Sequence, residues 1–436
     1  MRLRDGHDAE IGRLAIPALG ALVAEPLYIL ADTAVVGRLG TSALAGLAVA
    51  SAALLTGFAI FIFLAYGTTA AVSRLLGADK PAQAARQAVQ SLWLAACIGL
   101  LVVALGLAFA GPIVSLLGAS GVVAEQALIY LRISLLGVPF QLLVFAGTGY
   151  LRGLQDTRTP LLVAVAAAAG NLVLELILVP GLGFGIGASA LSTVAAQLAS
   201  AAVFVRLIVR ATDRLGASRR PDPAAMIRLA QVGGELLVRT VALRAALTAA
   251  TAVATRIGTV DVAAHEIAFA VWTLFGLALD ALAIAGQALT GKFLGAGDVD
   301  GARDAGRRML ELGVASGVAM GLLIMLVRPW LPAVFSTDTR VVNLAGYLLV
   351  WVAVMQPLNG LAFVLDGLLI GAGDMAFLAK AMVGAAVVFA IPVIVILWLG
   401  LGIGWLWAGI ATLMLSRAVP LSLRWRGGAW AVTGSG

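Results

Sequence analysis

The stretch Leu30-Ala31-Asp32-Thr33-Ala34-Val35-Val36-Gly37 places one carboxylate inside a long apolar segment. That segment covers residues 11–36, and as a helix it is long enough to cross a hydrocarbon core of about 30 Å. A charged side chain at this depth costs about 2.5 to 3.5 kcal/mol even on lenient insertion scales, so an acid here calls for a functional explanation. We therefore expect a membrane-spanning helix that carries a working carboxylate.

The composition extends this expectation to the whole chain. Of its 436 residues, 61% are hydrophobic and only 12% are charged, whereas a soluble domain has roughly 25% charged residues. Twelve apolar stretches are long enough to span a membrane. They lie near residues 11–36, 47–73, 90–117, 128–151, 160–180, 187–211, 229–255, 265–291, 309–335, 341–370, 379–399 and 404–423. The sequence thus predicts an all-α membrane protein with twelve transmembrane helices.

An internal repeat divides these helices into two sets of six. A shift by half the chain length superposes several landmarks: Gly40-Thr41 on Gly258-Thr259, Gly77-Ala78 on Gly295-Ala296, Pro139 on Pro357, and Asp156 on Asp374. Because six is an even number, both halves enter from the same side, which predicts a parallel repeat about an axis along the membrane normal. We expect one six-helix lobe over residues 1–212, a linker over 213–227 and a second lobe over 228–436.

The basic residues predict the orientation. Arg and Lys gather on one set of connections, above all in the stretch from Arg206 to Arg220, and the alternate set holds little beyond Arg38, Arg256 and Arg340. Positive charge collects on cytoplasmic connections, so both termini are expected in the cytoplasm of a multi-pass protein in the cell membrane. The net charge of +7 follows from these short connections. Nucleic-acid binding is not expected, because it needs a basic face on a soluble domain.

Polar residues in the first half form one constellation. Tyr28 and Asp32 lie one turn apart on one span, as do Asn171 and Glu175 on another, and residues at i and i+4 share a helix face. At a rise of about 1.5 Å per residue, both acids and Thr193 lie at one level in the outer third of the membrane. Two carboxylates close together in a poorly hydrated site share a proton, which predicts a proton-coupling site. The alternative is that these groups only hydrogen-bond the helices together.

The second half lacks this site, because Ala250 and Val393 stand where Asp32 and Glu175 would repeat. It carries its own polar residues, which we assign to the substrate cavity or to a second ion site: Asp280 and Gln287, seven apart on one span, Asn359 and Asp366, seven apart on another, and Glu266 near a span end. The position of Asp366 near the cytoplasmic end leaves a structural cap or ion pair equally open. Arg239 and Arg244 are the expected counter-ions of these acids.

Pro26 lies six residues before Asp32 in the same span. A proline inside a helix removes one backbone hydrogen bond and bends the helix. We therefore predict a bend at Pro26 that moves with protonation and serves as a gate.

At these residues the chain resembles the multidrug and toxic compound extrusion (MATE) family, most closely its DinF-like branch. The resemblance covers nearly the whole chain and lies in four stretches: residues 30–37, Asn171-Leu172-Val173-Leu174-Glu175, Leu279-Asp280-Ala281-Leu282-Ala283 and Leu365-Asp366-Gly367. It implies a V-shaped fold of two six-helix lobes that exports drugs against a proton or sodium gradient. Tyr28, Asp32, Asn171, Glu175 and Thr193 match the site of proton-linked members. Glu175 departs from the family's usual Asp, and Ala362 stands where sodium-linked relatives carry a Tyr.

We therefore predict a proton-coupled antiporter that exports amphipathic, cationic organic compounds by alternating access, as a monomer among membrane lipids and without a cofactor. A sodium-coupled exporter of the same family is one alternative, and a flippase for lipids or polysaccharide precursors is another. The flippase needs several arginines in its cavity to hold a pyrophosphate. An enzyme is not expected, because His7 and His265 are the only histidines and form no catalytic set with the acids.

Overall fold

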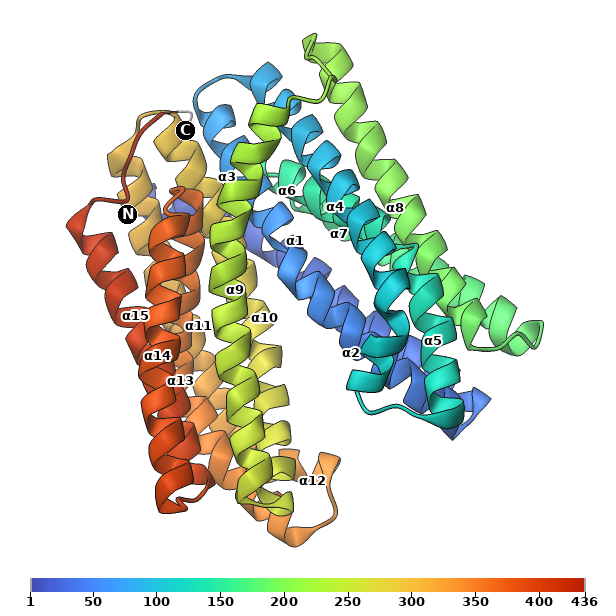
Figure 1. The fold of residues 1–436 in the computed structure, drawn as a ribbon. Coiled ribbons are helices and arrows are strands. Elements are labelled where there is room, and N and C mark those ends of the chain that lie inside the picture. The colour runs from blue at the N-terminus through green and yellow to red at the C-terminus, as the bar shows by residue number, and fades with distance from the viewer. Residues whose placement is uncertain (1, 435–436) are drawn as a thin grey trace. The chain divides into compact units, whose positions relative to one another are not determined.

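The computed structural model describes residues 2–434, with side chains from His7 onward. Within residues 2–434 the chain is almost entirely helical and contains no β-strand (Figure 1). Eleven helices are individually long and apolar enough to cross a membrane, and one pair of helices bent by 48° passes the same test together. These make twelve spans, so the prediction of an all-α, twelve-span membrane protein is confirmed.

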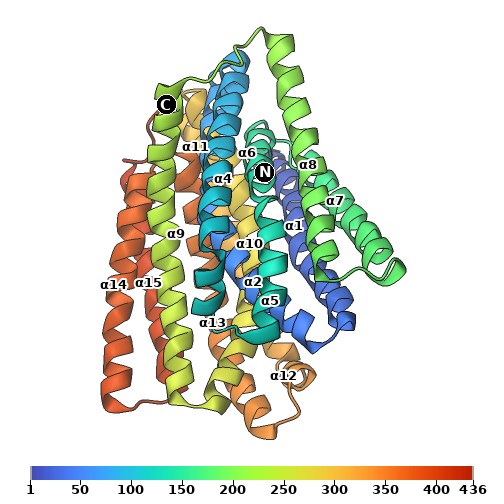
Figure 2. The same cartoon turned by 45° about the vertical axis from the view of Figure 1, so that its right-hand side comes forward.

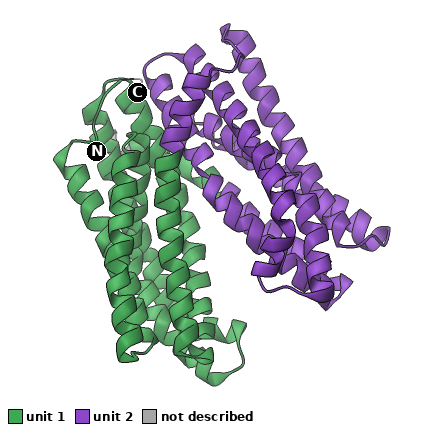
Figure 3. Cartoon of the chain, viewed as in Figure 1, with its two compact units in different colours: residues 1–19, 234–434, 436 green, residues 20–233, 435 purple. Residues whose placement is uncertain are grey.

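The chain forms two compact units, which Figure 3 colours separately. We call residues 20–233 the N-unit and residues 1–19 with 234–434 the C-unit. Helix α1 (Arg2–Val36) therefore begins in the C-unit and ends in the N-unit, and helix α9 (Pro223–Ile257) does the opposite. The lobe limits predicted at residues 212 and 228 follow the sequence repeat and stay a prediction.

The N-unit contains most of the helices of the first half. Besides its parts of α1 and α9, these are η1 (Gly37–Leu39), α2 (Thr41–Phe61), α3 (Phe63–Gly77), α4 (Pro81–Leu116), α5 (Gly121–Leu135), α6 (Val138–Gly153), α7 (Arg158–Leu176), the π-helical turn η2 (Ile177–Gly181) and α8 (Ile186–Leu215). The bent pair is α5 and α6, where the stretch expected as one span breaks before Pro139. Proline at the first turn of a helix is favourable, whereas inside a helix it leaves a carbonyl without a partner.

The C-unit contains the corresponding helices of the second half, which Figure 2 shows from a second side. They are α10 (Thr259–Gly295), α11 (Val299–Val327), the short α12 (Leu331–Phe335), α13 (Thr339–Gly371), α14 (Met375–Leu399) and α15 (Ile403–Gly427). Helices α10 and α13 approach closely, because a Cβ at Gly367 or Gly371 would collide with the backbone of Ala283 or Gln287. Glycines that let backbones approach are a usual device of membrane helix packing.

The repeat is visible in the backbone as well as in the sequence. Helices end at Gly77 and Gly295, and again at Gly153 and Gly371, and each of these two pairs is related by the same shift of half the chain length. The following turns also match, since Gln155 (φ 63°) and Gly373 (φ 77°) both adopt the left-handed conformation. Only glycine adopts that conformation without steric cost. The turn in the first half therefore keeps a backbone geometry that the side chain of Gln155 does not favour.

The first turns of α1 are anchored in the C-unit. Leu14 is fully buried and Ile11 is 2% exposed, in a cluster with residues of α10, α11 and α13. The carboxylate of Asp8 accepts two hydrogen bonds from the guanidinium of Arg308, at 2.6 and 2.8 Å, and Lys292 bonds Glu10 at 3.2 Å. Apolar packing and ion pairs therefore hold the first turns of the helix that carries Asp32 within the C-unit.

Candidate functional site

Asp32 lies in the N-unit on α1, and its side chain is almost fully buried. Two hydroxyl groups donate to its carboxylate. Ser189 Oγ on α8 donates to Oδ1 at 2.5 Å, and Tyr130 Oη on α5 donates to Oδ2 at 3.3 Å. Three helices therefore converge on this one carboxylate.

Glu175 lies next to Asp32 and Ser189, and its side chain is fully buried. It comes from α7, one turn after Asn171, whose side chain is also buried. In residues 7–434, no group meets hydrogen-bond geometry with either carboxylate oxygen of Glu175, nor with the Oδ1 or Nδ2 of Asn171. Because a buried polar group without a partner costs about 1 to 3 kcal/mol, these two residues are destabilising unless a ligand or a proton engages them.

A second hydrogen bond joins α1 to α8 beside the acids. The hydroxyls of Tyr28 and Thr193 are 2.6 Å apart, and Thr193 Oγ1 donates to the backbone carbonyl of Ser189 at 3.2 Å. With the Thr193 proton used in this way, Tyr28 is the donor and Thr193 the acceptor of the first bond. The structure thus brings Tyr28, Asp32, Glu175 and Thr193 into one site, and Asn171 lies one turn before Glu175 on α7.

The electrostatic setting of the site is unusual for two acids. Among the described side chains, no Lys, Arg or His forms an ion pair with Asp32 or Glu175, and the donors to Asp32 are neutral hydroxyls. Burying an ionised carboxylate without a counter-charge is expensive. The site can therefore accept a proton, a metal cation or an organic cation.

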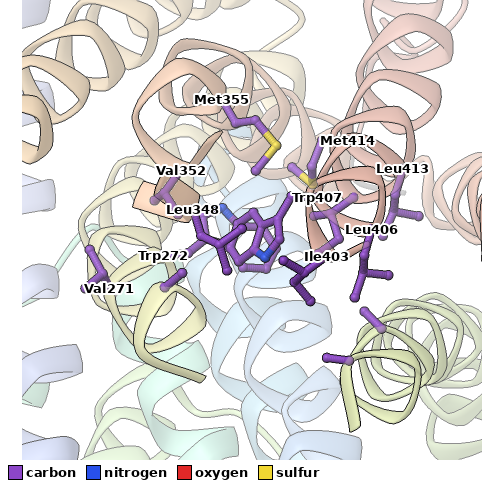
Figure 4. Close-up of a cluster of buried hydrophobic side chains, with 14 of the residues drawn as sticks. Val271, Trp272, Leu348, Val352, Met355, Ile403, Leu406, Trp407, Leu413 and Met414 are labelled. Carbon is purple, nitrogen blue, oxygen red and sulfur yellow. The ribbon is translucent and has the colours of Figure 1, made fainter. Parts of the chain in front are cut away.

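The equivalent place in the C-unit is an apolar core (Figure 4). Under the shift of half the chain length, Ala250 and Leu348 stand for Asp32 and Tyr130, and both are buried in this core. With Gly402-Ile403-Gly404 aligned on Gly185-Ile186-Gly187, Leu406 stands for Ser189. The same helix framework therefore carries a polar site in the first half and packed side chains in the second.

Asp366 in the C-unit has the opposite surroundings to Asp32. Its carboxylate forms ion pairs with Arg239 on α9 and Arg417 on α15, and the guanidinium of Arg417 lies over the ring of Phe363, 5.3 Å from its centroid. Arg239 was an expected counter-ion, and Arg417 was missed because a basic residue near a span end indicates only topology. Arg244 is exposed on α9.

The other second-half residues are spread along α10 and α13. Asp280 is partly exposed, Gln287 is buried, and the buried Asn359 donates its Nδ2 to Gln356 Oε1 at 3.5 Å. Glu266 is exposed on α10, 14 residues and thus about 21 Å before Asp280, so it does not join them. Pro26 lies within an unbroken α1, and its role as a gate stays a prediction.

Two residues of the site, Tyr130 and Ser189, were not predicted. Ser189 lies one turn before Thr193, on the same face of α8, so the i, i+4 rule contained the signal. Tyr130 is a tyrosine inside a span, and no spacing in the sequence linked it to Asp32.

Comparisons with known proteins find relatives that match most of the chain. The family model described as MatE matches residues 17–177 and 240–396. Protein DETOXIFICATION 44, chloroplastic, of Arabidopsis thaliana is 31% identical, over 97% of this chain and 81% of that protein. DNA damage-inducible protein F of Escherichia coli (strain K12) is 28% identical, over 99% and 95%.

A solved structure has the same fold. It is that of a MOP superfamily transporter from Pyrococcus furiosus, which covers 97% of this chain and 96% of its own at 23% identity, with a TM-score of 0.87. The family model and the DETOXIFICATION relative establish the relationship, and the structural match agrees with it. The chain therefore belongs to the MatE family, the multidrug and toxic compound extrusion transporters.

Proposed function

We propose that this transporter is a proton-coupled antiporter that exports amphipathic organic cations from the cytoplasm. The observation that carries the proposal is the carboxylate pair of the N-unit. Asp32 and Glu175 are buried side by side, hydroxyl groups donate to Asp32, and no described basic side chain pairs with either acid. Such a pair is most stable with one proton or one cation between its members.

This arrangement makes a proton and an organic cation competitors for one negative site. Binding of either weakens binding of the other, and the linkage is reciprocal. If the site faces the two sides of the membrane in turn, protons from outside displace the cation there, and the cation displaces protons on the cytoplasmic side. The hydrogen bond between Tyr28 and Thr193 joins α1 to α8. Because Asp32 lies on α1 one turn after Tyr28, we expect protonation of Asp32 to shift α1 relative to α8.

The surroundings of Asp366 weigh against the two alternatives. A sodium ion at that carboxylate would sit beside the two guanidinium groups of Arg239 and Arg417, which repel it. The same two arginines are engaged by Asp366, which lowers their capacity to hold a pyrophosphate. We also propose that the protein lies in the cell membrane as a monomer, with both termini in the cytoplasm.

The test is ion-driven flux in proteoliposomes. We expect purified protein to move ethidium under an imposed proton gradient without sodium. We expect Asp32→Asn to abolish this flux, because the variant lacks one of the two carboxylates that hold the proton or the cation between them. Thermal unfolding of the variant in detergent serves as the folding control. Flux that requires sodium, or flux that persists in Asp32→Asn, would show that the coupling lies elsewhere.

A further inference from the structure

Glu25 is a third acid on the N-unit, in the middle of the helix that carries Asp32. It lies 12 residues, about 18 Å, after Arg13 and 11 residues, about 17 Å, before Val36, the last residue of α1. This depth is near the centre of a hydrocarbon core of about 30 Å. Within residues 7–434, no Lys, Arg or His forms an ion pair with Glu25. The coupling proposed above leaves this acid without a role.

Glu25 lies on the face of α1 that bears the carboxylate site. Tyr28 and Asp32 follow it at i+3 and i+7, positions that share one face of a helix. The charges of Asp32, Glu175 and Glu25 all act on the hydroxyl of Tyr28, so all three acids lie within electrostatic reach of that group. An ionisable side chain at this depth almost always faces protein or water rather than lipid. We therefore place Glu25 on the side of α1 toward the acids.

Access to solvent decreases along this face. Glu25 is exposed, Tyr28 is partly exposed and Asp32 is buried. The helix rises by about 4.5 Å from the first of these residues to the second and by about 6 Å from the second to the third, steps that a hydroxyl group and water can bridge. A proton from water therefore meets Glu25 before it meets the buried pair.

The other elements at the site supply no competing charge. Tyr130 on α5 and Ser189 and Thr193 on α8 contribute hydroxyl groups, and the charged side chains that act on Tyr28 are the three acids alone among the described residues. Pro26 follows Glu25 and has no N–H, so one carbonyl of the preceding turn lacks its helical donor. Such a carbonyl attracts water, which favours hydration of the turn that bears Glu25.

We propose that Glu25 loads and unloads protons between water and the buried pair, with the hydroxyl of Tyr28 on the path. In loading, Glu25 takes a proton from water and passes it on, Tyr28 accepts one proton while it gives up its own, and Asp32 gains one. Glu25 and Tyr28 end as they began, and unloading is the reverse. This inference rests on the proposed function and adds a residue that sets the rate of proton exchange without holding the exchanged proton.

Stopped-flow binding of ethidium tests the proposal. Purified protein in detergent at acidic pH is mixed with ethidium in neutral buffer, and ethidium fluorescence follows binding. Because the cation replaces the proton, the binding rate at high ethidium concentration should reach a plateau set by proton loss from the pair. We expect Glu25→Gln to lower this plateau about tenfold or more, since a placed acid or base typically accelerates proton transfer by about 100-fold or more. The equilibrium Kd and the number of protons released per ethidium should stay unchanged.

Further variants separate proton transfer from a structural effect. Glu25→Asp keeps a carboxylate and should keep most of the wild-type rate. Sodium formate should raise the plateau of Glu25→Gln but not that of the wild-type protein, because a small acid replaces the missing carboxyl group. Glu125→Gln removes an exposed carboxylate near the start of α5 in the same unit and should behave as the wild-type protein does. Unfolding temperatures check folding, and Glu25→Ser is the second loss variant if Glu25→Gln does not fold.

An unchanged plateau in Glu25→Gln would overturn the inference, and a weaker equilibrium affinity beside it would make Glu25 a residue that binds the cation. A lowered plateau that formate does not restore would indicate a structural effect and would overturn the inference as well. Ethidium binding to the wild-type protein without proton release would contradict the proposed function itself, and this inference with it. Proton release in the wild-type protein with an unchanged plateau in Glu25→Gln would contradict the inference alone.

Discussion

Two buried carboxylates of this protein differ in what surrounds them, and the difference assigns them different roles. Asp32 accepts from the hydroxyls of Ser189 and Tyr130, whereas Asp366 is held by the guanidinium groups of Arg239 and Arg417. A carboxylate among hydroxyls exchanges a proton or a cation readily. A carboxylate held by two arginines already has its charge compensated, so we expect Asp366 to stabilise the C-unit.

Asp366→Asn should therefore destabilise the protein by about 3 to 5 kcal/mol, because the buried Arg417 and the partly buried Arg239 both lose their ion pair with this carboxylate. Thermal unfolding in detergent measures the effect. Arg244→Gln, which changes an exposed arginine on α9, should leave the unfolding temperature unchanged. A variant Asp366→Asn as stable as the wild-type protein, but unable to transport, would instead make Asp366 a coupling residue.

At the residue scale the sequence was most informative where spacing alone placed groups on one helix face. The pairs Tyr28 with Asp32 and Asn171 with Glu175 follow from that rule. Tyr130 could not be placed, because its helix, α5, is one member of a bent pair that reads as one continuous apolar span. Pairings across helices depend on rotation and depth, which an apolar run does not specify.

At the scale of elements, the length of the apolar stretches predicts the membrane spans well, but it does not predict where a span breaks into two helices. Every predicted span overlaps a helix, and the helices extend further at most ends, as α4 does in beginning at Pro81. The break before Pro139 has no counterpart at Pro357, which lies inside the unbroken α13. Equivalent prolines in the two halves thus have different consequences, since packing decides whether the helix tolerates the missing hydrogen bond.

The contact between α10 and α13 gives a prediction at this scale. Gly367→Val would drive a side chain into the backbone carbonyl of Ala283, and overpacking of this kind costs about 1 to 3 kcal/mol or more. Gly384→Ala is the control, because a Cβ there meets nothing within 4 Å and alanine favours a helix. Equal unfolding temperatures for the two variants would contradict the close packing of α10 on α13.

On the scale of the whole molecule, each half carries the same framework, and only the first half carries the buried pair of carboxylates. The repeat holds in helix ends and in left-handed turns, while the place of the polar site in the C-unit is filled by Ala250, Leu348 and Leu406. The C-unit also anchors the start of α1 through Leu14 and Asp8. The helix that bears Asp32 thereby belongs to both units.

The predicted orientation is testable with single cysteines. In a Cys97→Ser background, Ser120→Cys and Ser218→Cys put one thiol at an exposed position of the loop before α5 and of the loop after α8, which are predicted to lie on opposite sides of the membrane. A membrane-impermeant maleimide added to intact cells should label only Ser120→Cys, and both after lysis, because the basic linker is expected in the cytoplasm. Labelling of Ser218→Cys in intact cells would reverse the orientation.

The most direct measurement is the number of protons released when ethidium binds to the purified protein in weakly buffered detergent solution near neutral pH. We expect the wild-type protein to release protons on binding and sodium to leave this release unchanged. We expect Asp32→Asn and Glu175→Gln to release fewer protons, because each variant lacks one carboxylate of the pair. Ethidium binding without proton release, or the same release in Asp32→Asn, would contradict exchange at the carboxylate pair.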